Sequence, residues 1–206
     1  MEQDNALIER VLSGDDNAFG EIVGRYQKRI FSLCFRMCNN EQDTLDLSQE
    51  VFLRVYHNLK SFKGTSSFST WIYRIASNIS IDHLRKVKKM KVISLTPVSA
   101  DDDAPSFDLP DDTYSPEESY RKKELTEAIA AALIRLSPDH RRIIVLRDIN
   151  QLSYEEIGDI LELEPGTVKS RIFRARDQLR KILLDENRNL FASLPSYLAE
   201  GGEPRD

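Results

Sequence analysis

The feature that most constrains the fold is a pair of short helical segments joined by a tight turn, between residues 152 and 180. Ser153 and Glu156 have the Ser-x-x-Glu spacing of a capping box, which predicts that a helix begins there. Pro165 predicts the start of the second segment, because proline suits a first helical turn, where its missing N–H would have no partner. The stretch therefore predicts a helix-turn-helix, a motif whose second helix enters the DNA major groove.

The second segment of this motif has an apolar face and a basic face. The apolar side chains recur every three or four residues, as on a helix packed against a core: Val168, Ile172, Ala175 and Leu179. The outward face carries Lys169, Ser170, Arg171, Phe173, Arg174 and Arg176. Cations bind phosphates and guanine edges, serine can hydrogen-bond to different bases, and an apolar group can contact a thymine methyl. This face is therefore typical of a helix that recognises duplex DNA. A merely solvated basic face is the alternative interpretation.

An acidic segment divides the chain. Residues 92–119 hold eight acidic residues, among them Asp101 to Asp103, together with four prolines and no Lys or Arg. Without these acids the formal net charge of −5 becomes +3 for the rest of the chain. This composition favours a linker over a packed helix. The overall charge argues against indiscriminate DNA binding, whereas the local charge favours directed binding.

Helical spacing of apolar residues runs through the remaining sequence, without strand-like alternation of useful length. We therefore expect an all-α protein of two small helical domains joined by an acidic flexible linker. The expected parts are a first domain, a linker, a second domain with the helix-turn-helix, and a tail: residues 1–91, 92–120, 121–184 and 185–206.

Neither a membrane segment nor a cofactor is expected. No apolar run approaches the roughly 20 residues of a membrane helix, and the acidic, polar start is unlike a signal peptide. Cys34 and Cys38 lie four residues apart in an apolar helical pattern, so we expect reduced core residues, which fits the cytoplasm. A metal site would need further ligands that the nearby sequence does not supply.

The first domain carries two candidate binding surfaces. The spacing of Asp46, Gln49 and Glu50 indicates an acidic patch that could bind a basic partner. The alternative is structural, because the helix dipole stabilises acidic residues near the start of a helix. The second surface spans residues 62–78, where aromatic, hydroxyl, amide and cationic side chains suit a single-stranded nucleic acid. Core packing is the alternative for Phe68 and Trp71, which have core spacing.

Three blocks of the sequence, residues 46–52, 62–78 and 166–176, resemble the extracytoplasmic-function (ECF) sigma factors of bacterial RNA polymerase, in particular the sigma-E-like group. The blocks appear in the family's order, and the resemblance covers about residues 5–184. Thr65 stands where an acidic residue is common, and Ser77 where arginine is common. These departures concern promoter preference rather than the assignment.

The resemblance implies a promoter-specificity subunit of core RNA polymerase. Asp46, Gln49 and Glu50 would bind the clamp of the largest subunit, and the flap of the second largest subunit is the other expected contact on the polymerase. The melted −10 element would be held by Phe62, Lys63, Ser66, Phe68, Trp71, Arg74 and Asn78. The −35 duplex would be read by Thr167, Lys169, Ser170, Arg171, Phe173, Arg174 and Arg176. The acidic linker would extend toward the polymerase interior.

The resemblance also bears on partners and on competing functions. Many family members bind an anti-sigma factor, and the resemblance leaves open whether this chain has one. A regulator of duplex DNA alone would use its first domain as a sensor, and the sequence offers no ligand or phosphoacceptor site for that role. An enzyme is not expected, because the chain has no phosphate-cradling Gly-rich loop and its three histidines are scattered.

Overall fold

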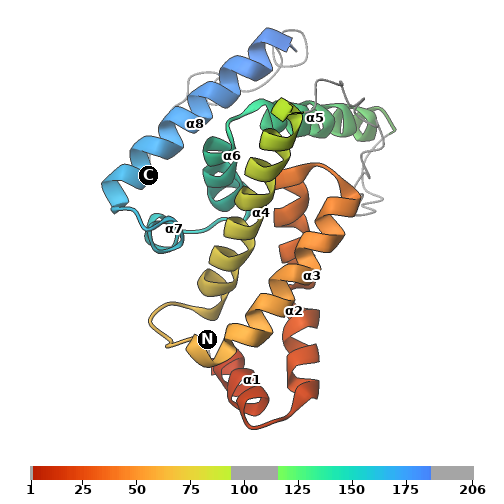
Figure 1. The fold of residues 1–206 in the computed structure, drawn as a ribbon. Coiled ribbons are helices and arrows are strands. Elements are labelled where there is room, and N and C mark those ends of the chain that lie inside the picture. The colour runs from red at the N-terminus through yellow and green to blue at the C-terminus, as the bar shows by residue number, and fades with distance from the viewer. Residues whose placement is uncertain (1, 94–115, 187–206) are drawn as a thin grey trace.

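The computed structural model describes residues 2–93 and 116–186 (Figure 1). Within these ranges the chain folds into helices and connecting turns and contains no strand, which confirms the predicted all-α class. Asp101 to Asp103, the centre of the acidic segment, lie outside the described residues.

Four α-helices and a short 3₁₀ turn make up the first range. They are α1 (Glu2–Leu12), α2 (Asp16–Cys38), α3 (Glu41–Asn58), η1 (Leu59–Ser61) and α4 (Phe68–Ile93). The chain reverses between α2 and α3 in two residues, since Asn39 adopts a left-handed conformation with φ 52° and Asn40 then caps α3. The Asn40 side chain accepts a hydrogen bond of 2.9 Å from the Asp43 N–H, which satisfies one of the free donors at the helix start.

The core of this part lies between α2, α3 and α4. Their inward side chains are almost fully buried, among them Ile22, Ile30, Val51, Val55, Ile72 and Ala76. These residues recur at three- and four-residue intervals along each helix, so each helix buries one stripe and exposes the opposite face. The packing fixes α4 across α2 and α3 and sets the position of the loop that precedes it (Figure 1).

The second range contains α5 (Pro116–Arg135), α6 (Pro138–Ile144), a π-helical turn η2 (Val145–Ile149), α7 (Tyr154–Leu161) and α8 (Pro165–Glu186). α4 continues to Ile93, and α5 begins at Pro116, so helix extends into both ends of the segment expected as linker. Proline can occupy a first helical position, where its missing N–H costs nothing.

α7 and α8 form the predicted helix-turn-helix. The Ser153 hydroxyl accepts from the Glu156 N–H at 3.1 Å, and the Glu156 carboxylate accepts from the Ser153 N–H at 2.8 Å, which confirms the capping box. α7 ends at Glu162, whose φ of 56° lies in the left-handed region. The following turn approaches so closely that a Cβ on Gly158 would lie 2.8 Å from the Leu163 carbonyl oxygen.

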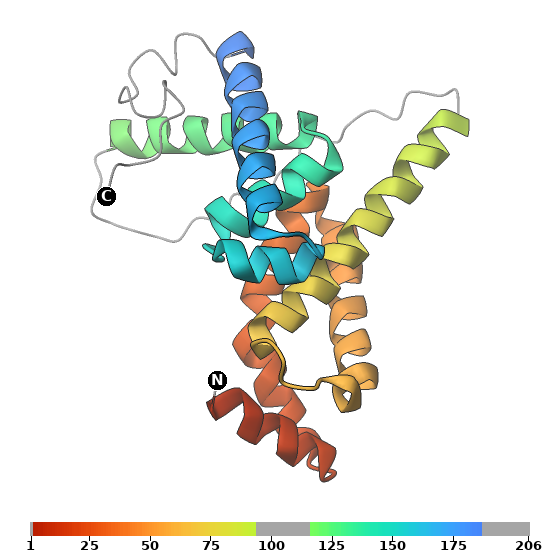
Figure 2. The same cartoon turned by 90° about the vertical axis from the view of Figure 1, so that its left-hand side faces the viewer.

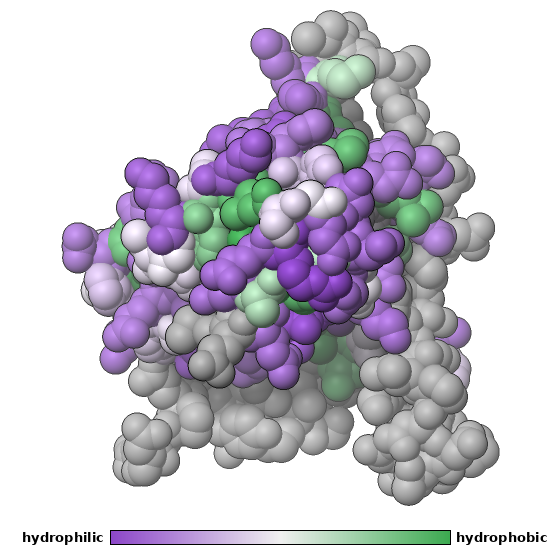
Figure 3. Space-filling model, turned by 90° about the horizontal axis from the view of Figure 1, so that it is seen from below, coloured by the Kyte–Doolittle hydropathy of each residue, from purple (hydrophilic) through white to green (hydrophobic). Residues whose placement is uncertain are grey.

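The two sets of helices pack against each other. Figures 1 and 2 both place α6 and α7 beside α4, and the buried apolar residues of both sets form a continuous cluster. The face seen from below is mainly hydrophilic, with hydrophobic areas interrupted by polar ones (Figure 3). Among the described helices, none combines the length and the apolar character needed to cross a membrane.

Candidate nucleic-acid interface

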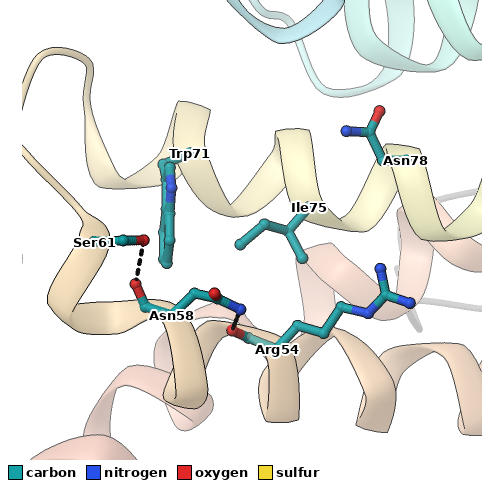
Figure 4. A pocket seen from close by; sticks show the side chains of 6 residues that line it. All are labelled: Arg54, Asn58, Ser61, Trp71, Ile75 and Asn78. Carbon is teal, nitrogen blue, oxygen red and sulfur yellow. Dashed lines mark hydrogen bonds between the residues drawn. The ribbon is translucent and has the colours of Figure 1, made fainter.

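A pocket of about 260 Å³ lies between the carboxyl end of α3 and the first half of α4 (Figure 4). Its lining residues are Arg54, Asn58, Ser61, Trp71, Ile75 and Asn78. Figure 4 shows the Trp71 indole standing beside Ser61 and Asn58, with Ile75 and Arg54 further along. The pocket thus combines an aromatic ring, amides, a hydroxyl and a cation, the set that stacks on and hydrogen-bonds to an unpaired base.

Aromatic packing holds the preceding loop against α4. The Phe62 ring lies 5.4 Å from the Trp71 ring and 5.5 Å from the Phe68 ring, centroid to centroid. Phe68 in turn packs edge-on against Tyr26 of α2 at 5.5 Å and is only 2% exposed. Phe68 is therefore a core residue that supports the loop from behind, whereas Phe62 and Trp71 are partly exposed.

Hydroxyl groups fix the start of α4. The Ser67 Oγ accepts a hydrogen bond of 3.1 Å from the Thr70 N–H, so Ser67 caps the helix. The same hydroxyl lies 2.7 Å from the Thr70 Oγ1 and 2.8 Å from the Ser69 Oγ. Lys63 is exposed and Ser66 half-buried in the loop before this cap, where Gly64 takes a positive φ of 70°. The loop is thus anchored at both ends and open between them.

Arg74 and Asn78 lie one turn apart on α4, and both contact the second set of helices, α5 to α8. The Arg74 guanidinium donates a hydrogen bond of 2.6 Å to the Asp159 carbonyl oxygen. Asn78 Oδ1 accepts a hydrogen bond of 2.6 Å from Arg142 on α6. In Figure 4 the Asn78 amide extends from α4 toward the second part of the chain. Two of the residues expected to bind the −10 element therefore hydrogen-bond to other residues of the protein.

The expected acidic patch lies on the outer face of α3. Asp46 and Gln49 are exposed, while the Glu50 carboxylate accepts a 2.5 Å hydrogen bond from Arg54. Leu45 and Leu53 are 42% and 60% exposed, and they lie four residues before and after Gln49. An i, i+4, i+8 row places these three side chains on one face. The patch is therefore mixed, with apolar side chains among the acidic and amide groups.

The recognition face of α8 points away from the core. Val168, Ile172 and Ala175 are buried, whereas Phe173 is 65% exposed. The polar members of this face are also exposed: Thr167, Lys169, Ser170, Arg171 and Arg174. Figures 1 and 2 show α8 leaving the turn after α7 along the outer side of the molecule. Exposed cations around an exposed aromatic ring suit contact with duplex DNA.

Arg176 differs from the other cations of α8. Its guanidinium donates hydrogen bonds of 2.5 Å and 3.2 Å to the two carboxylate oxygens of Asp148. Asp148 belongs to η2, so this ion pair ties the recognition helix to the turn before α7. Both side chains are partly shielded, with 41% and 33% of their surface exposed. Arg176 therefore has a structural role beside its expected contact with DNA.

Arg54 and Asn58 are pocket residues that sequence reasoning missed. On α3 they read as ordinary exposed polar residues, and α4 brings Trp71 and Asn78 across from them only in the tertiary structure. The Asn58 amide donates a 2.8 Å hydrogen bond to the Arg54 carbonyl oxygen, and the Asn58 backbone carbonyl accepts one from the Ser61 hydroxyl at 2.7 Å. The sequence signal that could have identified them is their position on α3, one and two helical turns after Glu50.

Both cysteines lie on α2, and Cys34 packs against α4. Cys34 is fully buried, and the Ser80 hydroxyl donates toward its sulfur at 3.7 Å. Burial raises the pKa of the Cys34 thiol, and it raises the pKa of the Cys38 thiol to about 12. Both remain unpaired thiols. Within residues 2–93 and 116–186, no three His, Cys, Asp or Glu side chains gather as a metal site would require.

Comparison with known proteins matches both parts of the chain to a family. Residues 22–90 match Sigma-70 region 2, and residues 126–179 match Sigma-70, region 4. The first range contains the pocket and the acidic patch, and the second contains the helix-turn-helix.

Curated relatives are similar over nearly their whole length. The sequence is 39% identical to the ECF RNA polymerase sigma factor SigW of Bacillus subtilis, over 86% of this chain and 95% of that protein. It is 38% identical to the RNA polymerase sigma-H factor of Pseudomonas aeruginosa, over 89% and 95%. Identity to the ECF RNA polymerase sigma-E factor of Escherichia coli K12 is 37%, over 85% and 92%.

Solved structures have the same fold. CnrH in complex with the cytosolic domain of CnrY superposes with a TM-score of 0.65 at 25% identity, covering 90% of this chain and 99% of that one. The sigma factor RpoE of Bartonella quintana, in complex with the anti-sigma factor NepR, gives a TM-score of 0.62 at 23% identity, covering 82% and 98%.

Proposed function

The chain belongs to the ECF sigma factors, and we propose that it acts as an alternative sigma factor that gives bacterial RNA polymerase its promoter specificity. Two family regions in the order 22–90 and 126–179 carry this proposal. A regulator of duplex DNA alone would leave the first region without a role. RNA synthesis itself stays with the polymerase, so the chain serves as an initiation factor.

The pocket between α3 and α4 supports capture of a melted −10 base. Removing a base from the duplex stack costs a few kcal/mol, which stacking and hydrogen bonds to protein offset. Trp71 offers a ring, Asn58 and Asn78 offer amides, and the exposed Lys63 can follow the strand backbone. We assign Phe62 and Ser66 to the loop that closes over the base, and Phe68 to its support. This is strand capture without chemistry on the DNA.

The recognition face of α8 supports contact with the −35 duplex. Lys169, Arg171 and Arg174 are exposed cations, and Phe173 lies among them. A helix that presents three cations around an apolar ring can bind phosphates and also contact base edges in the major groove. Thr167 and Ser170 lie at the start of the helix, where recognition helices approach the bases.

The outer face of α3 supports docking on core polymerase. Asp46, Gln49 and Glu50 supply polarity, while Leu45 and Leu53 supply apolar area that the described part of the chain leaves uncovered. Apolar groups surrounded by polar ones are typical of a protein interface. We propose that this face binds the clamp of the largest subunit and that the second region binds the flap of the second largest.

Partners and location follow from this role. Because the chain would work on core polymerase and promoter DNA, we place it in the cytoplasm. Of the two solved structures described above, one holds CnrH with the cytosolic domain of CnrY, and the other holds a sigma factor with the anti-sigma factor NepR. An anti-sigma factor is therefore also a proposed partner.

Transcription with core polymerase from a promoter library tests the proposal. The full chain should co-elute with core enzyme and select a defined pair of −35 and −10 elements. Asn78→Ala should impair open-complex formation, and a pre-melted bubble should restore it only in part, because a base contact is lost. Failure to co-elute with core enzyme, or transcription without promoter preference, would contradict the role.

A further inference from the structure

Gly166 lies in the first turn of the recognition helix α8 and is exposed. We propose that a side chain is absent here because the α8 main chain approaches the edges of base pairs at this point, which rests on the proposed role of α8 at the −35 duplex. The recognition face would then combine a point of close steric fit with its cationic contacts.

The fold of the chain gives no reason for a glycine at position 166. The residue is helical and does not adopt the positive φ found at Gly14 and Gly64. A Cβ at Gly166 would meet nothing within 4 Å beyond its immediate chain neighbours, whereas one at Gly158 would lie 2.8 Å from the Leu163 carbonyl oxygen. Glycine in a helix lowers stability relative to alanine. Position 166 therefore gives up helix stability without a benefit inside the described part of the chain.

The place of Gly166 on the helix directs this open space outward. At about 100° per residue, Gly166 lies on the opposite side of α8 from the buried Ala175 and within about 20° of Phe173. Phe173 is 65% exposed, and the exposed Ser170 lies between it and Gly166 on the same face. Figure 1 shows this end of α8 at the periphery of the molecule, next to α7. Gly166, Ser170 and Phe173 therefore form a row along the middle of the outward face.

This row is lowest at its start. The Ser170 hydroxyl donates a 3.0 Å hydrogen bond to the Thr167 carbonyl oxygen, so the serine side chain lies back on the helix. Lys169 and Arg171, by contrast, are long and exposed, and they flank the row on its two sides. A main chain between longer side chains can approach the floor of the major groove while the cations reach to either side of it.

The first turn of α8 is also the part of the helix that should lie nearest to the bases. In helix-turn-helix complexes, the amino-terminal residues of the second helix contact base edges. The first cation after Pro165 is Lys169, one turn further on, so shape rather than charge dominates at the start of α8. A methyl group added where two surfaces pack closely must displace one of them. Gly166→Ala should therefore hold the first turn away from the bases.

Binding of promoter DNA by the assembled holoenzyme tests this close approach. Core polymerase is loaded with the full chain, and its affinity is measured for a duplex fragment with a −35 and a −10 element selected from a promoter library. The same fragment with a scrambled −35 element is the reference. Gly24→Ala on α2 is the matched control, because a Cβ at Gly24 would also meet nothing within 4 Å. Urea unfolding of the free chain is measured for each variant.

We expect Gly166→Ala to weaken binding to the matched fragment by roughly five- to a hundredfold and to leave binding to the scrambled fragment unchanged. The loss should fall on one or two adjacent −35 positions, and the salt slope should stay the same because no phosphate contact is removed. Gly166→Ser should act like Gly166→Ala, and Gly166→Val should lose more, since the effect follows side-chain size. Gly166→Ala should nevertheless unfold at a higher urea concentration than the wild-type chain. Gly24→Ala should keep the −35 preference.

Equal affinities of Gly166→Ala and the wild-type chain for the matched fragment would overturn the close approach to base edges. A reduced salt slope with an unchanged base preference would also overturn it, because the lost contact would then be to a phosphate. Failure of the proposed −35 role looks different: the wild-type holoenzyme would bind the matched and scrambled fragments equally. Weaker binding by a variant that is more stable than the wild-type chain cannot come from unfolding.

Discussion

The Arg54 guanidinium donates a 2.5 Å hydrogen bond to the Glu50 carboxylate, one helical turn away on α3. Glu50 belongs to the face proposed for polymerase, and Arg54 lines the pocket proposed for a −10 base. Both side chains are about half exposed, so the pair contributes only about 0.3–0.5 kcal/mol to stability. Its consequence is electrostatic: while the pair is formed, Glu50 neutralises a cation at the pocket proposed for the −10 base.

Glu50→Ala should therefore change two activities at once. We expect weaker binding to core polymerase and roughly two- to fivefold tighter binding to a single-stranded −10 oligonucleotide, because Arg54 loses its counter-charge. Asp46→Ala is the matched control, since this exposed carboxylate has the same proposed partner but no bond to Arg54. Titrations with core enzyme and with the oligonucleotide measure both effects. Equal oligonucleotide affinities of the two variants would contradict the link.

Replacement of Gly158 should destabilise the helix-turn-helix. A Cβ there would lie 2.8 Å from the Leu163 carbonyl oxygen, which belongs to the backbone of the turn and cannot rotate away. We expect Gly158→Ala to lower the free energy of unfolding by roughly 1–3 kcal/mol. Gly166→Ala is the control, because a Cβ there would meet no other part of the protein within 4 Å and alanine favours the helix by about 0.5–1 kcal/mol. Urea unfolding of both variants measures the difference, and equal midpoints would refute the close approach.

Local patterns in the sequence were enough to predict the helix-turn-helix. The Ser153–Glu156 box and the buried stripe of Val168, Ile172 and Ala175 depend on neighbours within one or two turns, and the structure confirms both. The contact of Arg142 with Asn78 joins residues 64 positions apart, and no periodicity encodes it. Long-range pairs depend on how helices dock, which local propensity does not specify.

The candidate site was predictable to the same limited extent. The aromatic and amide residues of α4 could be proposed from one continuous stretch, since Trp71 and Asn78 share a helix. Phe68 could not be assigned to either role by spacing alone, and its 2% exposure places it in the core. Arg54 and Asn58 were missed because their place in the pocket depends on α4 crossing α3.

The pairing of Arg176 with Asp148 should limit the contribution of this cation to the proposed duplex binding. Asp148→Ala removes the carboxylate that holds the guanidinium at 2.5 Å. Arg176 can then neutralise one more phosphate, so the slope of log affinity against log salt should steepen by about one. Asp177→Ala, which removes an α8 carboxylate paired with Lys181, is the control for charge.

Two further variants complete that measurement. Arg176→Ala in the presence of Asp148 should change the slope by less than one, and the double variant should lose the increase seen with Asp148→Ala. We expect Asp148→Ala also to lower stability by about 1 kcal/mol, so binding is compared where both proteins are folded. A steeper slope that persists in the double variant would show that another cation is responsible.

The raised pKa of Cys38 predicts slow alkylation. Burial, followed by the nearby Cys34 and Asp43, raises this pKa to about 12, because each disfavours the thiolate. At pH 8 the reactive thiolate is then roughly one part in ten thousand, and its share grows tenfold per pH unit up to the pKa. Mass spectrometry after iodoacetamide treatment should find Cys38 unmodified in the folded protein and modified after denaturation. Rapid alkylation of the folded protein at pH 8 would contradict this.

The outward side chains of α8 should divide into those that read bases and those that bind phosphates. Substitution of a cation bound to a base edge should remove roughly 1–3 kcal/mol of discrimination at one or two −35 positions. Loss of a phosphate contact should weaken all sequences alike and reduce the salt slope by about one. The substitutions to alanine are made one at a time in the full chain at Lys169, Ser170, Arg171, Phe173, Arg174 and Arg176.

Binding to −35 duplexes with every single base change, at several salt concentrations, separates the two groups. We expect Arg171 or Lys169 among the readers, because these exposed cations lie in the first turns of α8, where a recognition helix meets the bases. Lys123→Ala on α5 should leave both preference and slope unchanged. Exposed Phe173 has no charge, so its loss should alter preference at a thymine without altering the slope. If all six folded variants kept the original preference and slope, another surface would read the −35 element.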